Sequence, residues 1–135
     1  MARFWAFRLA AALVPRIPTG IARPAAVALG VVLWALASGT RRRVEGNLAH
    51  VPHLAGEPRK LRRAARGVFV TMTLNYLDFF RGSRLTDAQL DAGWTIENQA
   101  ALDDAMAQGR GLVLISGHFG NFEGGASRLG AIGHQ

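Results

Sequence analysis

The sequence predicts an α/β fold in which N-terminal helices pack on the beginning of an α/β sandwich. Apolar segments up to residue 82 are predicted to be helices, and in the longest of them, Glu57–Gly82, apolar residues recur at spacings of three and four. A β-α-β run follows, in which short strands at Trp94–Glu97 and Leu112–Ile115 flank a helix that begins after Asn98. The second of these strands is a short continuous apolar run, as expected for a strand buried inside a sheet.

The composition fits one modest globular domain. The chain has 135 residues, of which 50% are hydrophobic, and it contains no cysteine. This composition excludes global disorder, and it suits a reducing compartment or a protein that needs no disulfide bonds.

Charge is distributed unevenly along the chain. Residues 1–67 hold eleven Arg, one Lys and two Glu, a net of +10, whereas residues 68–135 carry a net of −3. A basic half that also contains apolar segments points to an anionic partner surface, either a membrane or a nucleic acid. The apolar context favours anionic membrane lipids. No nucleic acid is expected as a partner, because no recognition motif or aromatic platform accompanies the arginines.

Two N-terminal segments are predicted to be helices. Phe4–Val14 mixes aromatic and aliphatic residues with an arginine, as interfacial amphipathic helices do, and two prolines end it. Pro24–Ser38 is apolar on every side but shorter than the ~20 residues that cross a bilayer squarely. A re-entrant, a monotopic and a core helix are all compatible with this pattern. Membrane contact is favoured because Arg41–Arg43 follow directly. A signal peptide is disfavoured because prolines and arginines interrupt the hydrophobic region.

Asn47–Glu57 is predicted to be a connection. Its two histidines, His50 and His53, are not expected to bind a metal, because no carboxylate or thiol stands close enough to complete a ligand set and a proline lies between them.

Glu57–Gly82 is predicted to form the longest helix, mostly buried beyond its basic first turns. Two adjacent apolar stripes support this, the first made of Leu61, Ala65, Val68, Met72, Tyr76 and Phe79, the second of Phe69, Thr73, Leu77 and Phe80. The Arg59–Arg66 cluster suits a solvated face, or a site for a phosphate of lipid or coenzyme A.

Two shorter helices carry end signals. Thr86 and Gln89 resemble a capping box for a helix at Asp87–Asp91. Asn98 is predicted to cap the next helix, and Gly109 to close it.

The stretch Gly109–Gly125, GRGLVLISGHFGNFEGG, holds the candidate site. After the apolar strand it offers His118 and Glu123, which would lie about 500° apart on a continuous helix and so would not share a face. They can meet only if the chain turns between them, and Gly120 and Asn121 are residue types that allow a turn or cap a helix. A neutral imidazole can then take a proton from a hydroxyl while the carboxylate fixes its tautomer.

This spacing alone is a weak signal. In the structural interpretation, His118 ends a strand with its ring nitrogens bonded to backbone, and Glu123 complements the dipole of a helix. In the catalytic interpretation no nucleophilic side chain is required. The chain has no cysteine, and Ser116 is not in the Gly-x-Ser-x-Gly setting of a nucleophile elbow, so direct attack by a substrate hydroxyl is the simpler mechanism.

The whole stretch GRGLVLISGHFGNFE resembles the signature of bacterial lipid A late acyltransferases and of the related phosphatidylinositol mannoside acyltransferases, within the lysophospholipid-acyltransferase-like superfamily. Arg41–Leu48 and the aromatic helix around Asn75-Tyr76 are similar to that family as well. Phe122 departs from it, because tryptophan is usual there. Family members are considerably longer, so the chain resembles their N-terminal half, a truncated α/β acyltransferase sandwich.

The resemblance implies transfer of a fatty acyl group from an acyl thioester, acyl-carrier protein or acyl-CoA, to a hydroxyl of a membrane glycolipid. It implies His118 as general base with Glu123 as its partner, and no metal or prosthetic group. The residues expected to bind substrate are Gly117, Gly120, Asn121 and Arg110.

The expected domains are membrane-associated helices at 1–40 and the N-terminal part of a catalytic domain at 41–135. The expected location is the cytoplasmic face of the inner membrane, with peripheral or N-terminal anchoring. The alternative is a non-catalytic, membrane-associated lipid-binding protein.

Overall fold

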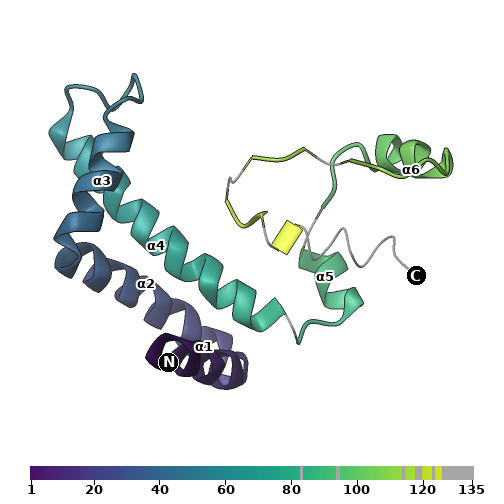
Figure 1. Ribbon diagram of the computed structural model, residues 1–135, viewed down its shortest axis with the longest axis horizontal. Coiled ribbons are helices and arrows are strands. Elements are labelled where there is room, and N and C mark those ends of the chain that lie inside the picture. Colours follow the sequence, from purple (N-terminus) through teal and green to yellow (C-terminus); the bar gives the residue numbers. More distant parts are fainter. Residues whose placement is uncertain (83, 94, 114, 118–119, 123, 126–135) are drawn as a thin grey trace. The chain divides into compact units, whose positions relative to one another are not determined.

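The computed structural model describes residues 1–82, 84–93, 95–113, 115–117, 120–122 and 124–125. The chain divides into two compact units, Met1–Ser83 and Arg84–Gln135. The elements in chain order are α1 (Ala2–Leu13), the 3₁₀ helix η1 (Val14–Arg16), α2 (Thr19–Leu36), α3 (Ser38–Leu48), α4 (Pro58–Gly82), α5 (Asp87–Gly93) and α6 (Gln99–Ala107) (Figure 1). The predicted boundary at residue 40, between membrane-associated helices and a catalytic domain, is a division by function and stays a prediction.

The helical segmentation of the N-terminus is as predicted, except at the start of α2 and in α3, a helix that was not predicted from the sequence. Prolines end α1 as expected, through η1 and an extended Ile17. The apolar helix then begins at Thr19 rather than at Pro24, which lies inside it. Pro18, with ψ of 140°, is the non-helical residue that sets the boundary, whereas Pro24 removes only one hydrogen bond of the helical ladder.

The earlier start makes α2 eighteen residues long, or about 27 Å at ~1.5 Å per residue. By length and composition α2 is therefore long and apolar enough to cross a membrane, a test that a soluble core helix and a signal sequence also pass. Only 17% of this segment is buried inside the protein.

The first unit is built around α2 and α4, which run side by side in opposite directions (Figure 1). The buried face of α2 consists of small residues one turn apart: Ala22, Ala26 and Gly30. A Cβ atom at Gly30 would lie 2.6 Å from the Cα of Val70, so the two backbones approach as closely as a glycine allows. The Thr73 hydroxyl donates a 2.8 Å hydrogen bond to the Ala26 carbonyl across this contact. Small residues and an interhelical hydroxyl bond are also how helices pack in membranes.

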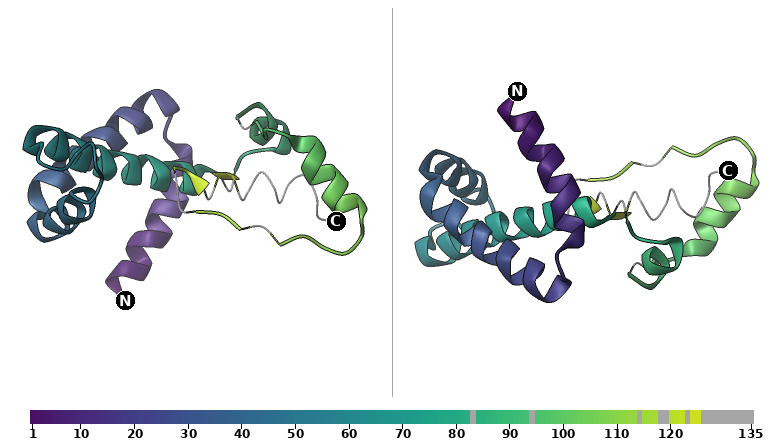
Figure 2. Two further views of the ribbon diagram at one scale, coloured as in Figure 1. Left: turned by 90° about the horizontal axis from the view of Figure 1, so that it is seen from above. Right: turned by 90° about the horizontal axis from the view of Figure 1, so that it is seen from below.

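Contacts at the other end of this pair hold α4 to the start of α2. The Arg81 guanidinium donates to the Ile17 carbonyl at 2.6 Å and to the Thr19 hydroxyl at 2.7 Å. Phe7 of α1 lies against the last turns of α4, with its ring centroid 5.1 Å from that of Phe80. From this anchor α1 runs at a steep angle to α2 and α4 (Figure 2).

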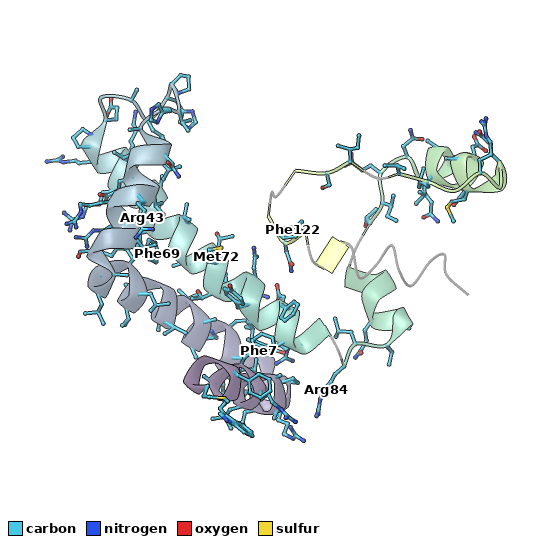
Figure 3. The ribbon with its side chains drawn as sticks, viewed as in Figure 1. Phe7, Arg43, Phe69, Met72, Arg84 and Phe122 are labelled. Carbon is cyan, nitrogen blue, oxygen red and sulfur yellow. The ribbon has the colours of Figure 1, made fainter. Side chains whose placement is uncertain are left out.

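The prediction that α4 is mostly buried beyond its basic turns is wrong. The buried stripe is Ala65, Phe69, Thr73 and Leu77. The other stripe is largely exposed: Val68, Met72, Tyr76 and Phe79 are between 37% and 55% accessible. Figure 3 shows Met72 on the side of α4 turned away from α2. The reason is geometric, because α2 covers only one side of α4 and Thr73 fits the gap that Gly30 leaves.

The described residues do not adopt the predicted α/β fold, because they are helical or irregular with no strand among them. Residues 95–97 of the first predicted strand and 112, 113 and 115 of the second are in loops, and Trp94 and Leu114 lie outside the described residues. A strand exists only through hydrogen bonds to a neighbouring strand. These segments have no such neighbour in the described chain, and Val113 and Ile115 are 87% and 96% exposed.

The predicted helix ends of the second unit are confirmed, with one difference in how a helix is capped. Thr86 and Gln89 form a reciprocal capping box, with N–H to side-chain distances of 3.0 and 3.3 Å. Asn98 occupies the N-cap position of α6, but with a left-handed φ of 56° and no capping bond from its side chain. Gly109 follows the end of α6 with φ of 64°, a conformation that favours glycine.

Candidate functional site

The candidate site begins where α6 ends. Gly109 and Gly111 have left-handed φ values of 64° and 78° and flank Arg110. The Arg110 guanidinium donates to the side chain of Gln108, and Arg110 itself is exposed. The two glycines therefore redirect the chain on both sides of an arginine that is accessible to solvent.

The turn predicted around Gly120 and Asn121 is present. Gly120 has a left-handed φ of 60°. The Asn121 side-chain oxygen accepts a 3.1 Å hydrogen bond from the N–H of Gly124, while residues 122, 124 and 125 are helical. Asn121 is thus an N-cap, bonded to the third residue of the new helix. This local role accounts for an asparagine at this position whether or not substrate also contacts it.

The backbone just before this turn is irregular. Gly117 lies in a loop, and the Ser116 hydroxyl donates to the Gly117 carbonyl at 3.1 Å. His118 and Glu123 lie outside the described residues. Their pairing, and the substrate-binding roles of Gly117, Gly120, Asn121 and Arg110, stay predictions. The described residues between these two positions include the left-handed Gly120 and the capping residue Asn121.

Comparison with known proteins then identifies the family. Residues 1–134 match the family model for bacterial lipid A biosynthesis acyltransferases. The chain belongs to this family. No curated protein and no solved structure matches the chain. The match covers both compact units, so the exposed apolar helices and the glycine-rich stretch both lie within the region that resembles this family.

Membership in the lipid A acyltransferase family implies an acyl donor and a lipid acceptor as substrates. A lipid acceptor lies in a membrane, and the first unit presents an N-terminal apolar helix, α2, that is long enough to serve as an anchor. The all-helical first unit is compatible with the N-terminal helical part of a domain of this family.

Sequence reasoning missed a cluster of one aromatic and two basic side chains at the C-terminal end of α2. There the Trp34 ring contacts two guanidinium groups, with the Cζ atoms of Arg41 and Arg62 at 5.5 and 5.2 Å from its centroid. The available signal was a tryptophan in the last turn of an apolar helix directly before a run of arginines. The partner on α4 could not be inferred, because Arg62 lies far along the sequence from Trp34.

Proposed function

We propose that this protein transfers a fatty acyl group from an acyl thioester, on acyl-carrier protein or coenzyme A, to a hydroxyl of a membrane glycolipid. The family provides the class of reaction. The glycolipid is a lipid A precursor, a mannosylated phosphoinositide or a related molecule. The observation that carries the assignment of the site is the turn at Gly120 with the Asn121 cap, because it interrupts the chain between His118 and Glu123 as a pairing of the two requires.

In this mechanism the His118 imidazole accepts the proton of the acceptor hydroxyl as its oxygen attacks the thioester carbonyl carbon. The carbon–sulfur bond then breaks, and the imidazolium returns the proton to the departing thiolate. Glu123 bonds the other ring nitrogen, fixes the tautomer and stabilises the imidazolium. Backbone N–H groups between Gly117 and Asn121 stabilise the thioester oxyanion.

Arg110 is proposed to contact an anionic part of a substrate. It is exposed, and the two glycines beside it leave room for a ligand to approach the backbone. Its bond to Gln108 is a local contact that a phosphate can replace, since a guanidinium binds a phosphate more strongly than a neutral amide.

The decisive experiment measures acyl transfer by the wild-type chain and by His118→Ala, in mixed micelles that contain a glycolipid acceptor and an acyl thioester. Loss of the general base is expected to lower turnover by about 10²–10⁴-fold. Helical content measured by circular dichroism should be unchanged. A folded His118→Ala protein with near-normal turnover would show that His118 is not the base.

The same assay separates the enzyme from the alternative, a non-catalytic lipid-binding protein. The observation that favours the alternative is the extent of exposed apolar surface on α1, α2 and α4. Vesicle binding is expected from both. Acyl transfer that depends on His118 is expected only from the enzyme, so a wild-type chain that binds vesicles without transferring acyl groups supports the alternative.

A further inference from the structure

One end of the first unit carries most of its positive charge. This basic end is formed by α3 and the first turns of α4, which pack against each other. Glu45 and Glu57 are its two acids. Its eight cationic side chains are Arg41, Arg42, Arg43, Arg59, Lys60, Arg62, Arg63 and Arg66. The first turn of α4 contains no acidic residue, and Glu57 directly before it is the one acid near the positive end of the helix dipole.

Trp34 fixes the arrangement of this end. Its ring, in the last turn of α2, lies against Arg41 of α3 and Arg62 of α4. Arg41 also donates to the carbonyls of Trp34 and Ala35 at 3.2 and 3.5 Å, which satisfies acceptors left open at the end of α2. These contacts of Trp34 therefore join the end of α2 to α3 and to the start of α4. They hold in place the helices that carry the surrounding arginines.

Among the cationic side chains of the basic end, only Lys60 has an ion-pair partner within the part of the chain that the structure describes. Two ion pairs occur there, Arg23–Asp78 and Lys60–Glu57, at 3.8 and 3.6 Å. Neither involves an arginine of the basic end. The outward-facing Arg42, Arg43 and Arg63 are exposed, so their guanidinium groups are available to an external anion. Figure 3 labels Arg43 on α3, at the end of the unit where α4 begins.

The surface next to the basic end is apolar. The last two turns of α2 expose three large aliphatic side chains, Val32, Leu33 and Leu36, of which Leu36 is 77% accessible. A ligand that suits both surfaces has a phosphate group joined to a hydrocarbon body. Free phosphate would leave these aliphatic side chains in water, and a nucleic acid would place further charge against them.

We propose that the basic end is a binding site for the phosphate groups of anionic phospholipids, which holds the last turns of α2 at the level where headgroups meet acyl chains. Trp34 lies at that boundary, where tryptophan is enriched in membrane proteins. This site consists of other residues than the proposed acyl-transfer site, and its existence does not depend on the proposed reaction.

The test measures partition of the full chain into vesicles of phosphatidylcholine with increasing phosphatidylglycerol. An arginine at an anionic surface contributes about 1 kcal/mol, which is about fivefold in the partition coefficient. Arg43→Gln is expected to lose about fivefold on anionic vesicles, and Arg43→Gln/Arg63→Gln about 25-fold. Neither should change binding to pure phosphatidylcholine. Arg43→Lys should retain most of the binding, because the charge remains.

The matched control is Arg84→Gln, which removes one exposed positive charge from the second unit. Little change is expected for it. An equal loss from Arg84→Gln and Arg43→Gln would show a net-charge effect and overturn the site. Release by inorganic phosphate or by a single-stranded oligonucleotide, at ionic strength matched with chloride, would also overturn it, in favour of a free-phosphate or a nucleic-acid site. Acyl transfer by Arg43→Gln in detergent micelles should be normal, so failure of this proposal is distinguishable from failure of the acyltransferase proposal.

Discussion

Substituting Gly30 with alanine should weaken the contact on which the first unit is built. The added Cβ would lie 2.6 Å from the Val70 Cα, 2.8 Å from the Thr73 hydroxyl and 3.0 Å from the Phe69 carbonyl oxygen. Two of these atoms are backbone, so α2 and α4 must separate. Overpacking costs about 1–3 kcal/mol, and stretching the bond from Thr73 to Ala26 costs about 1 kcal/mol more. The higher helix propensity of alanine returns about 1 kcal/mol. The net expectation is a destabilisation of about 1–3 kcal/mol.

Gly67→Ala is the control for this prediction. Gly67 lies inside α4, and a Cβ there would meet nothing within 4 Å, so only the gain in propensity remains. Chemical denaturation followed by far-UV circular dichroism, in one mild detergent for all proteins, should place the two variants about 2–4 kcal/mol apart on opposite sides of wild type. If Gly30→Ala is as stable as Gly67→Ala, the helices do not approach each other at Gly30 and the described packing is refuted.

Two further predictions concern the site and the membrane. Glu123→Gln, which can still accept a hydrogen bond, should lower turnover less than Glu123→Ala, and both should leave thioester binding nearly intact. If donor binding collapses while turnover per bound donor survives, Glu123 belongs to a binding pocket or caps a helix. The chain should sediment with membranes at low salt and be partly released at 1 M NaCl, where the Debye length falls to about 3 Å while apolar contacts persist. Recovery of the intact protein wholly in the soluble fraction at low salt contradicts membrane association.

Features whose hydrogen bonds close within a few residues were predictable from the sequence. The capping box of Thr86 and Gln89 and the turn at Gly120-Asn121 occur where the sequence predicts them. Each depends on residue type and short spacing alone. Asn98 occupies the N-cap position of α6 as predicted, but its side chain makes no capping hydrogen bond. The reason is that a left-handed backbone at the N-cap does not direct the side chain to the helix N–H groups.

Helix packing was predictable only in part. Periodicity identifies α4 almost to the residue, yet it does not decide which of two adjacent stripes is buried. That choice depends on α2, where Gly30 removes a side chain and leaves space for Thr73. The spacing of Ala22, Ala26 and Gly30 is a signal in the sequence for a close helix contact. It does not name the partner helix, and for this reason the exposure of Met72 and Tyr76 was not foreseen.

Strands show most clearly what cannot be predicted from local sequence. An apolar run such as Leu112–Ile115 has no internal hydrogen bonds to hold an extended conformation. Its side chains fit a sheet, but the sheet has to come from other segments, and in the described chain the exposed Val113 and Ile115 have none. The turn after it does not depend on a sheet, since Gly120 and the Asn121 cap bond locally. The elements proposed to shape the catalytic turn are thus local, whereas a sheet that would cover the preceding segment depends on long-range pairing. Acyl transfer to a hydroxyl competes with hydrolysis of the thioester, so covering the Leu112–Ile115 segment is what should separate a protein that transfers acyl groups from one that only hydrolyses the donor.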